Sequence, residues 1–458
     1  MDAVLSALDA NANDALERLF GLLKIESVST DPAYAAACGH AADWLVAELT
    51  ALGFEASART TPGHPMVVAH HEGPEGAPHV LFYGHYDVQP VDPIDLWNTV
   101  PFEPTLKEGP DGPRIYARGA SDDKGQLMTF VEACRGWKEA TGALPCRVTI
   151  LFEGEEESGS PSLEPFLKAT ADELKADIAL VCDTNMWNAE TPAITTALRG
   201  MTSEEVTIFA ANRDLHSGYY GGAAQNPIHI LSRILADMHD EAGAVTLEGF
   251  YDGVEEVPAD ILASWETLGF SPKEFLGEIG LSLPSGEVNR SVLEKTWSRP
   301  TAEVNGITGG YTGDGFKTVI AAQASAKVSF RLVGKQDPDA VAAAFRKHVE
   351  ERLPEGCRAE FKAHGRGPAT QLDYTMPALQ SAAKALTDEW GKDAALIAGG
   401  GSIPIVGNFK RELGMDSLLI GFALSSDAIH SPNEKYEVRS FQKGARSWAR
   451  VLKALADG

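Results

Sequence analysis

Four apolar runs with strand character each lead into a histidine or a carboxylate, and this pattern restricts the possible fold. The runs lie at residues 80–83, 148–152, 178–182 and 417–424, and the polar residues beyond them are His85, Glu157, Asp183 and His430. Asp122 stands just before a predicted helix. In an open α/β sheet, ligands gather outside the carboxyl ends of the strands. We therefore expect these five residues, which are far apart in sequence, to lie close together in space.

Two imidazoles and three carboxylates suit a pair of borderline divalent cations such as zinc. Taken singly, each residue has a simpler explanation. A histidine or aspartate at a strand end is most often an ordinary turn or capping residue. The three consecutive glutamates at 155–157 would usually form a solvated acidic loop. The joint occurrence of ligand-type residues at all these positions nevertheless favours a metal site.

The order of elements predicts an α/β protein: a mostly parallel sheet flanked by helices, with a smaller α+β domain inserted. Continuous apolar strands alternate with helices in the first part of the chain, which is typical of a doubly wound sheet. After residue 198 the strands alternate polar and apolar residues instead, as at 204–210 and 326–334, which indicates one exposed face. We expect residues 1–197 and 369–458 to form the catalytic domain, and 198–368 to form an inserted lid and dimerisation domain. Residues 99–118 read as a polar connection.

The composition argues against several classes of binding partner. A formal net charge of -26 over 458 residues argues against nucleic acid and anionic membranes, because both would repel the chain. No segment approaches the roughly 18 apolar residues that a membrane helix needs. The first 25 residues have no basic n-region and predict an amphipathic helix instead of a secretory signal. Five scattered cysteines without CxxC spacing indicate reduced thiols in a cytoplasmic protein.

Six segments resemble motifs of the cocatalytic dizinc metallopeptidases, a family that includes carnosinase-like dipeptidases, acetylornithine deacetylase, succinyl-diaminopimelate desuccinylase, aminoacylases and glutamate carboxypeptidase. The segments read GHYDVQP, RGASDDKG, EGEEESGS, DLHSGYYGG, GGGSIP and AIHSPNE. They run through nearly the whole chain in the family's order. The last four most resemble the carnosinase-like dipeptidase branch.

The resemblance implies a role for each of the five residues. Asp122 would bridge two divalent ions, for which the resemblance implies zinc, with manganese or cobalt also suitable. His85 and Asp183 would complete the ligands of one ion, and Glu157 and His430 those of the other. The pair at 122–123 resembles a pair that the family joins by a cis peptide bond.

Catalytic roles follow in the same way. Glu156 would be the general base that takes a proton from a metal-bridging water and later delivers it to the leaving amine. Asp87, in the H-x-D triplet that begins at His85, would receive the second N–H of the metal-bound imidazole. His216 would stabilise the oxyanion, and in the family the equivalent histidine can come from the other subunit of a dimer. The substrate-binding positions implied are Arg331, which would hold a carboxylate, and Asn305, Thr318 and Ser402.

The sequence thus predicts a metallopeptidase that cleaves the amide of a dipeptide or short peptide with a free C-terminal carboxylate. Two alternatives remain open at this point. One is an N-acyl-amino-acid deacylase of the same family, since the same site hydrolyses both bonds. The other is a catalytically silent binding relative, which the loss of a ligand or of the base would signal, and no such loss occurs. We expect the substrate to be a small peptide or N-acyl amino acid. We also expect two copies of the chain to form a homodimer.

Overall fold

A computed structural model describes residues 1–401 and 403–458, and the chain divides into two compact units. The first comprises Met1–Thr196, Leu372–Ile397 and Asn408–Gly458, and the second comprises Ala197–Gln371 and Ala398–Gly407. Residues 398–407 therefore group with the inserted segment, whereas the sequence placed them in the larger domain.

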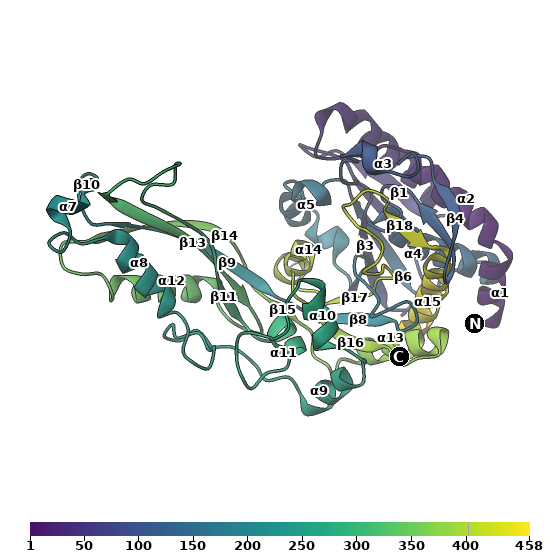
Figure 1. The fold of residues 1–458 in the computed structure, drawn as a ribbon. Helices are drawn as coiled ribbons and strands as arrows, with labels where there is room; N and C mark the ends of the chain where they lie inside the picture. The colour runs from purple at the N-terminus through teal and green to yellow at the C-terminus, as the bar shows by residue number, and fades with distance from the viewer. Residues whose placement is uncertain (402) are drawn as a thin grey trace. The chain divides into compact units, whose positions relative to one another are not determined.

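The first unit is built on a large mixed sheet flanked by helices (Figure 1). Its strands, in spatial order, are β1 (Glu55–Arg59), β2 (Met66–His71), β6 (Arg147–Glu153), β3 (His79–His85), β7 (Ile178–Val181), β17 (Ser417–Leu419) and β8 (Ala193–Leu198), with β16 (Ala395–Gly399) beside β8. Its helices are α1 (Asp2–Ala10), α2 (Ala12–Leu23), α3 (Ala35–Ala51), α4 (Lys124–Thr141), α5 (Leu163–Ala169), α6 (Ala171–Leu174), α13 (Pro377–Trp390) and α15 (Val438–Asp457). The α/β class is confirmed.

The sheet is parallel only in its centre, which corrects the prediction of a mostly parallel sheet. Three neighbouring pairs are parallel: β6–β3, β3–β7 and β7–β17. The pairs β1–β2, β2–β6 and β17–β8 are antiparallel. A continuous apolar strand such as β6 has the same sequence pattern in either setting, because both of its faces are buried. The four parallel strands therefore bring their carboxyl ends to one edge.

The core of the first unit joins this central sheet to its helices. The ring of Phe82, on β3, stacks on Phe130 of α4 with centroids 3.8 Å apart. Trp448 of α15 meets Phe82 edge-on at 5.5 Å, and all three side chains are fully buried. Aromatic contacts of this kind add to the free energy gained from burial. They fix α4, which begins two residues after Asp122, against β3, which ends at His85.

Residues 99–118 contain a hairpin where the sequence predicted a polar connection. Strands β4 (Thr105–Gly109) and β5 (Gly112–Tyr116) pair antiparallel, and β18 (Lys435–Glu437) pairs with β5. Gly112 has a φ of 121°, a backbone conformation that favours glycine and closes the tight turn. The charged surface of the two strands hid their pattern, since most of their residues are not buried.

The second unit contains a four-stranded antiparallel sheet in the order β11 (Thr301–Gly309), β13 (Gln323–Leu332), β9 (Gly200–Phe209) and β14 (Arg358–Gly367). Helices α8 (Pro227–Ala236) and α12 (Pro338–Glu350) pack on it. Residues along β9 alternate between buried and partly exposed, as the sequence pattern predicted. The remaining elements are β10 (Leu215–His216), β12 (Val319–Ile320), β15 (Thr370–Gln371), α7 (Ser217–Tyr220), α9 (Ala259–Glu266), α10 (Pro272–Glu278) and α11 (Val292–Trp297), and α14 (Pro404–Asn408) lies where the chain leaves this unit.

Candidate metal centre

The five predicted ligands meet at the edge where the parallel strands end. His85 is the last residue of β3, and Asp183 lies two residues beyond β7. Glu157 lies in a single 3₁₀ turn, Glu156–Ser158, that follows β6. Asp122 precedes α4, and His430 lies in the loop that follows β17 and leads into β18. All five belong to the first unit.

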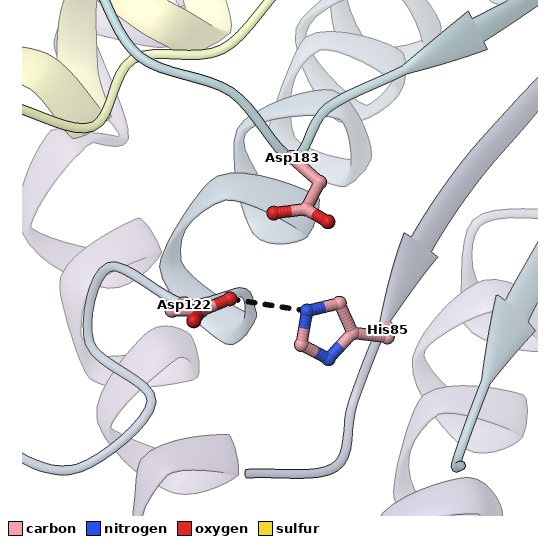
Figure 2. A group of neighbouring side chains, drawn as sticks. All are labelled: His85, Asp122 and Asp183. Carbon is pink, nitrogen blue, oxygen red and sulfur yellow. Dashed lines mark hydrogen bonds and ion pairs between the residues drawn. The ribbon is translucent and has the colours of Figure 1, made fainter. Parts of the chain in front are cut away.

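The ligand atoms form two groups that share Asp122. In the first group, atoms of His85, Asp122 and Asp183 lie within 4.8 Å of one another (Figure 2). Nε2 of His85 lies 3.1 Å from Oδ1 of Asp122. Figure 2 shows the carboxylates of Asp122 and Asp183 directed toward the same space beside the imidazole.

The second group consists of Asp122, Glu157 and His430, again within 4.8 Å. Nε2 of His430 lies 2.9 Å from Oδ2 of Asp122 and 3.2 Å from Oε2 of Glu157. The two oxygens of Asp122 therefore serve different groups. A carboxylate placed in this way is suited to bridging two cations.

Asp87 supports the site through both its backbone carbonyl and its carboxylate. Nδ1 of His85 is 3.1 Å from the backbone carbonyl of Asp87 and 3.4 Å from its carboxylate. The buried carboxylate also accepts hydrogen bonds from the backbone N–H groups of Glu156, at 3.2 Å, and Glu157, at 3.0 Å. Asp87 thus contacts the imidazole and holds the backbone of the 3₁₀ turn.

The three glutamates of the acidic run have separate surroundings. The Glu155 side chain is buried, and its carboxylate accepts hydrogen bonds from the N–H groups of His64, at 2.9 Å, and Ser162, at 3.1 Å. A Cβ on Gly63 would collide with it, at 1.4 Å from Oε1. Glu155 is therefore occupied in holding loops together. The side chains of Glu156 and Glu157 are not used in this way, and their roles as base and ligand stay a prediction.

Burial and neighbouring side chains shift the pKa values of three of the proposed ligands. Burial raises the pKa of Asp183, and the neighbouring carboxylates of Asp122 and Glu156 raise it further. Hydrogen bonds to Asp122 and Glu157 raise the pKa of His430 to about 10. Burial works against protonation of His85, but hydrogen bonds to Asp122 and Asp87 outweigh it and raise the pKa of this imidazole.

The residues present fit divalent cations. Oε1 of Glu157 is buried and has no hydrogen-bond partner. Throughout the described part of the chain, no lysine or arginine forms an ion pair with Asp122, Glu157 or Asp183. The imidazoles of His85 and His430 offset the negative charge of Asp122 and Glu157 only in part, because Asp183 and Glu156 add negative charge nearby, and a lack of positive charge away from water is costly. Two divalent cations would supply that charge, and carboxylate with imidazole is a ligand set that zinc accepts.

Four other predicted residues, His216, Asn305, Thr318 and Arg331, belong to the second unit, and none of these four is buried. His216, in β10, is exposed; its Nδ1 accepts a hydrogen bond from the N–H of Gly218 at 3.0 Å. Asn305 is exposed at an irregularity of β11, and Thr318 is exposed just before β12. Arg331 is partly exposed in β13, opposite Thr301. Ser402 lies outside the described residues.

Sequence reasoning missed Arg199. Its Nε donates to the carbonyl of Gly400 at 3.1 Å. Burial and, to a smaller extent, the positive charge of Arg331 lower the pKa of Arg199 to about 10. The second unit thus contains two arginines whose charges interact. A basic residue at the end of the apolar segment AITTALRG was the only signal in the sequence.

A model of peptidase family M20/M25/M40 matches residues 81–454. The chain belongs to this family. The resemblance drawn from the six motifs is therefore confirmed, and the protein is a peptidase. Within the described residues, no helix has both the length and the apolar character required to cross a membrane.

Several family members are similar over most of the chain. The Cys-Gly metallodipeptidase dug1 of Schizosaccharomyces pombe is 28% identical over 471 residues, covering 100% of this chain and 98% of that protein. The human Beta-Ala-His dipeptidase is 28% identical over 384 residues, covering 82% of this chain and 75% of that protein. Among solved structures, the M20 family metallo-carboxypeptidase Sso-CP2 from Sulfolobus solfataricus has a TM-score of 0.78 at 30% identity, covering 97% of this chain and 99% of that one.

Proposed function

We propose that this M20-family peptidase is a metal-dependent dipeptidase, which hydrolyses the amide of dipeptides with a free C-terminal carboxylate. The observation that carries the proposal is the division of the Asp122 carboxylate between two ligand groups, with Glu156 next to Glu157 in sequence. Similarity to a Cys-Gly metallodipeptidase and to a Beta-Ala-His dipeptidase supports the substrate class. These relatives favour peptide hydrolysis over deacylation of N-acyl amino acids.

Two divalent ions complete the proposed site, with zinc the best match and manganese or cobalt as alternatives. His85, Asp122 and Asp183 would hold one ion, and Asp122, Glu157 and His430 the other. When bound, the pair supplies Lewis-acid charge beside the scissile amide. The fit of the ligands rests on the unpartnered Oε1 of Glu157 and on the clustered carboxylates, whose charge the two imidazoles offset only in part.

Glu156 would hold and move the proton. Burial raises the pKa of its carboxyl above the ordinary value, and the charges of Glu157 and Asp122 raise it further, against the opposing effect of His85. A carboxylate with a raised pKa is a better proton acceptor near neutral pH. It would accept a proton from the attacking water and deliver that proton to the leaving amine. Asp87 keeps Glu156 in place by binding its backbone N–H.

The second unit would bind substrate and a second copy of the chain. Arg331 would pair with the C-terminal carboxylate through its forked guanidinium. Asn305, Thr318 and Ser402 would contact the rest of the substrate, and His216 would donate to the developing oxyanion. Residues 198–368 would form a lid and dimerisation domain, so that His216 acts on the partner chain of a homodimer. Several large apolar residues of this unit are exposed, among them Tyr219, Ile307 and Phe316, which supports a partner surface on this unit.

We also place the enzyme in the cytoplasm. All five cysteines are free, and four of them are buried. Free, buried thiols are typical of a reducing compartment.

A substrate panel with zinc-reconstituted protein tests the proposal. We expect cleavage of free dipeptides, much weaker cleavage of N-acetyl amino acids, and about two divalent ions per chain in active protein. Faster hydrolysis of N-acetyl amino acids than of every dipeptide would make the protein a deacylase. Active protein that contains no divalent ion would refute the metal site.

A further inference from the structure

A buried glutamate outside the five ligands joins the two loops that carry Asp122 and His430. Glu434 lies four residues beyond His430, and its side chain is completely buried. Its carboxylate receives four hydrogen bonds. Oε1 accepts from the N–H groups of Ser121, at 2.9 Å, and Asp122, at 3.0 Å. Oε2 accepts from the N–H of Gly119, at 2.9 Å, and from Nη1 of Arg118, at 2.8 Å.

Three of these donors belong to the backbone of one short loop, residues 119–122, which ends at Asp122. A carboxylate has about four lone-pair positions, so all of its acceptor capacity is used here. Hydrogen bonds to a charged acceptor are stronger than neutral ones. The loop therefore has its position set by Glu434. The hydroxyl of Ser121 adds a second tie, because it donates to the buried Asp427 at 2.8 Å.

The other end of the connection is the loop of His430. The side chain of His430 is 53% exposed, and it contacts Asp122 and Glu157. The loop of His430 is also anchored by Asn433, whose side-chain amide donates to the backbone carbonyl of Leu96 at 2.8 Å. Glu434 follows directly. It thus ties the loop of His430 to the loop of Asp122.

The His85 side of the site has an independent tie to the same loop. The carboxylate of Asp123, the residue next to Asp122, accepts a hydrogen bond from the backbone N–H of His85 at 3.1 Å. His85 itself is fully buried at the end of a central strand. Loss of Glu434 would leave this tie intact. The two groups that share Asp122 therefore differ in what holds them.

We propose that Glu434 is a positioning residue that sets the distance between Asp122 and His430, and so determines the affinity of the His430-side ion selectively. The inference rests on the proposed two-ion site. Residues that support metal ligands without touching the ion change metal affinity by about 10–100-fold when replaced. Glu434→Gln keeps the shape but turns one acceptor oxygen into an NH₂ group, which would face donors.

The test is zinc binding, measured by equilibrium dialysis at defined free zinc and by calorimetric titration with a competing chelator. Wild-type protein should bind two ions, and His430→Ala serves as the reference that loses one. In Glu434→Gln, we expect the ion that His430→Ala loses to be bound about 10–100-fold more weakly, while the affinity of the other ion changes by less than about threefold. The matched control is Glu437→Gln. Glu437 is also buried and paired with cations, Lys435 and Arg114, and among the described residues none of its ion pairs reaches the loop of Asp122.

Each outcome decides the matter. Selective loss in Glu434→Gln with two ions retained in Glu437→Gln supports the proposal. Equal weakening of both ions, or the same loss in Glu437→Gln, means that Glu434 only stabilises the fold, and unchanged binding overturns the proposal as well. If Glu434→Gln does not fold, Glu434→Asp, which keeps the charge but shortens the reach, is judged by the same criteria. Fewer than two ions in wild-type protein would refute the two-ion site itself, and the inference with it.

Discussion

The two units differ in how firmly protein contacts hold their proposed functional side chains before any metal ion or substrate binds. In the first unit His85 and Asp87 are fully buried, and the ligands are joined by short contacts through Asp122. In the second unit His216 and Thr318 are exposed. Metal ligands must be placed accurately before the ion arrives, and they need a supporting shell. Groups that contact a flexible substrate can take their final positions when it binds.

The largest effect should come from the base of the first unit. Glu156→Gln keeps the shape of the side chain but removes the proton acceptor. We expect turnover to fall by about 10²–10⁴ with metal content unchanged, as measured by steady-state kinetics and metal analysis. Glu157→Gln is the companion variant and should lose metal as well as activity. If Glu156→Gln stays active while Glu157→Gln loses activity and keeps its metal, the two roles are reversed.

A smaller effect is expected from the second unit, where contacts form only with substrate. Arg331→Ala should lower kcat/KM for free dipeptides by about 10–100-fold, the worth of a charge-assisted hydrogen bond to a carboxylate. C-terminal amides of the same dipeptides should lose far less. Lys327→Ala, an exposed cation on the same strand, is the control and should affect neither. Equal losses on acids and amides would indicate a structural role for Arg331.

The same contrast explains how much of the fold could be predicted. The strands of the first unit were visible because burial on both faces gives continuous apolar runs, and their order along the chain placed the ligands at one edge. The hairpin of β4 and β5 was missed because its faces are largely exposed. The last predicted strand was also too long. Beyond Ile420, whose N–H still donates to the carbonyl of Val181, two backbone N–H groups bond to side chains: Phe422 donates to Gln126 and Leu424 to Asp427.

The sequence allowed the ligand residues of the site to be predicted. It did not allow prediction of the hydrogen bonds that hold those residues in place. A histidine or aspartate after a strand is visible in a sequence. The partner of a buried carboxylate is not, because it depends on which backbone N–H groups the fold brings near. Asp87, Glu155 and Glu434 all bind backbone donors of distant segments. The motifs indicated the contact of Asp87 with His85, but they did not indicate that its carboxylate also binds the backbone of residues 156 and 157. Glu434 lies in the segment AIHSPNE, but its backbone donors could not be predicted from that segment.

A third prediction asks whether the second unit serves a neighbouring chain. His216→Ala and Glu156→Gln should each be nearly inactive alone. If His216 acts in trans, a mixed dimer has one site with both residues intact. Random exchange at equal amounts then restores about a quarter of wild-type activity, since half of the dimers are mixed and half of their sites are complete. Exchange should be verified with differently tagged chains. Verified exchange without recovery would mean that His216 acts on its own chain or not at all.

The smallest effect concerns the metal-free protein and the charge of His430. The pKa of this imidazole is raised to about 10 by its hydrogen bonds to Asp122 and Glu157, from an ordinary value of about 6.5. A pKa raised on folding stabilises the folded state fully below the unfolded value, and this stabilisation is lost as pH rises through the folded value. The melting temperature of metal-free protein should therefore fall between about pH 6.5 and 10 more steeply than that of His430→Gln, which cannot titrate. Because the side chain is 53% exposed, solvent screens the interaction and the difference should be at most a few degrees. Calorimetry of both proteins in excess chelator measures it, and the subtraction removes the contributions of groups common to the two. Parallel pH profiles would show that the contacts of His430 with these carboxylates do not persist without metal, and that the site of the first unit is less completely organised in the free chain than its buried residues indicate.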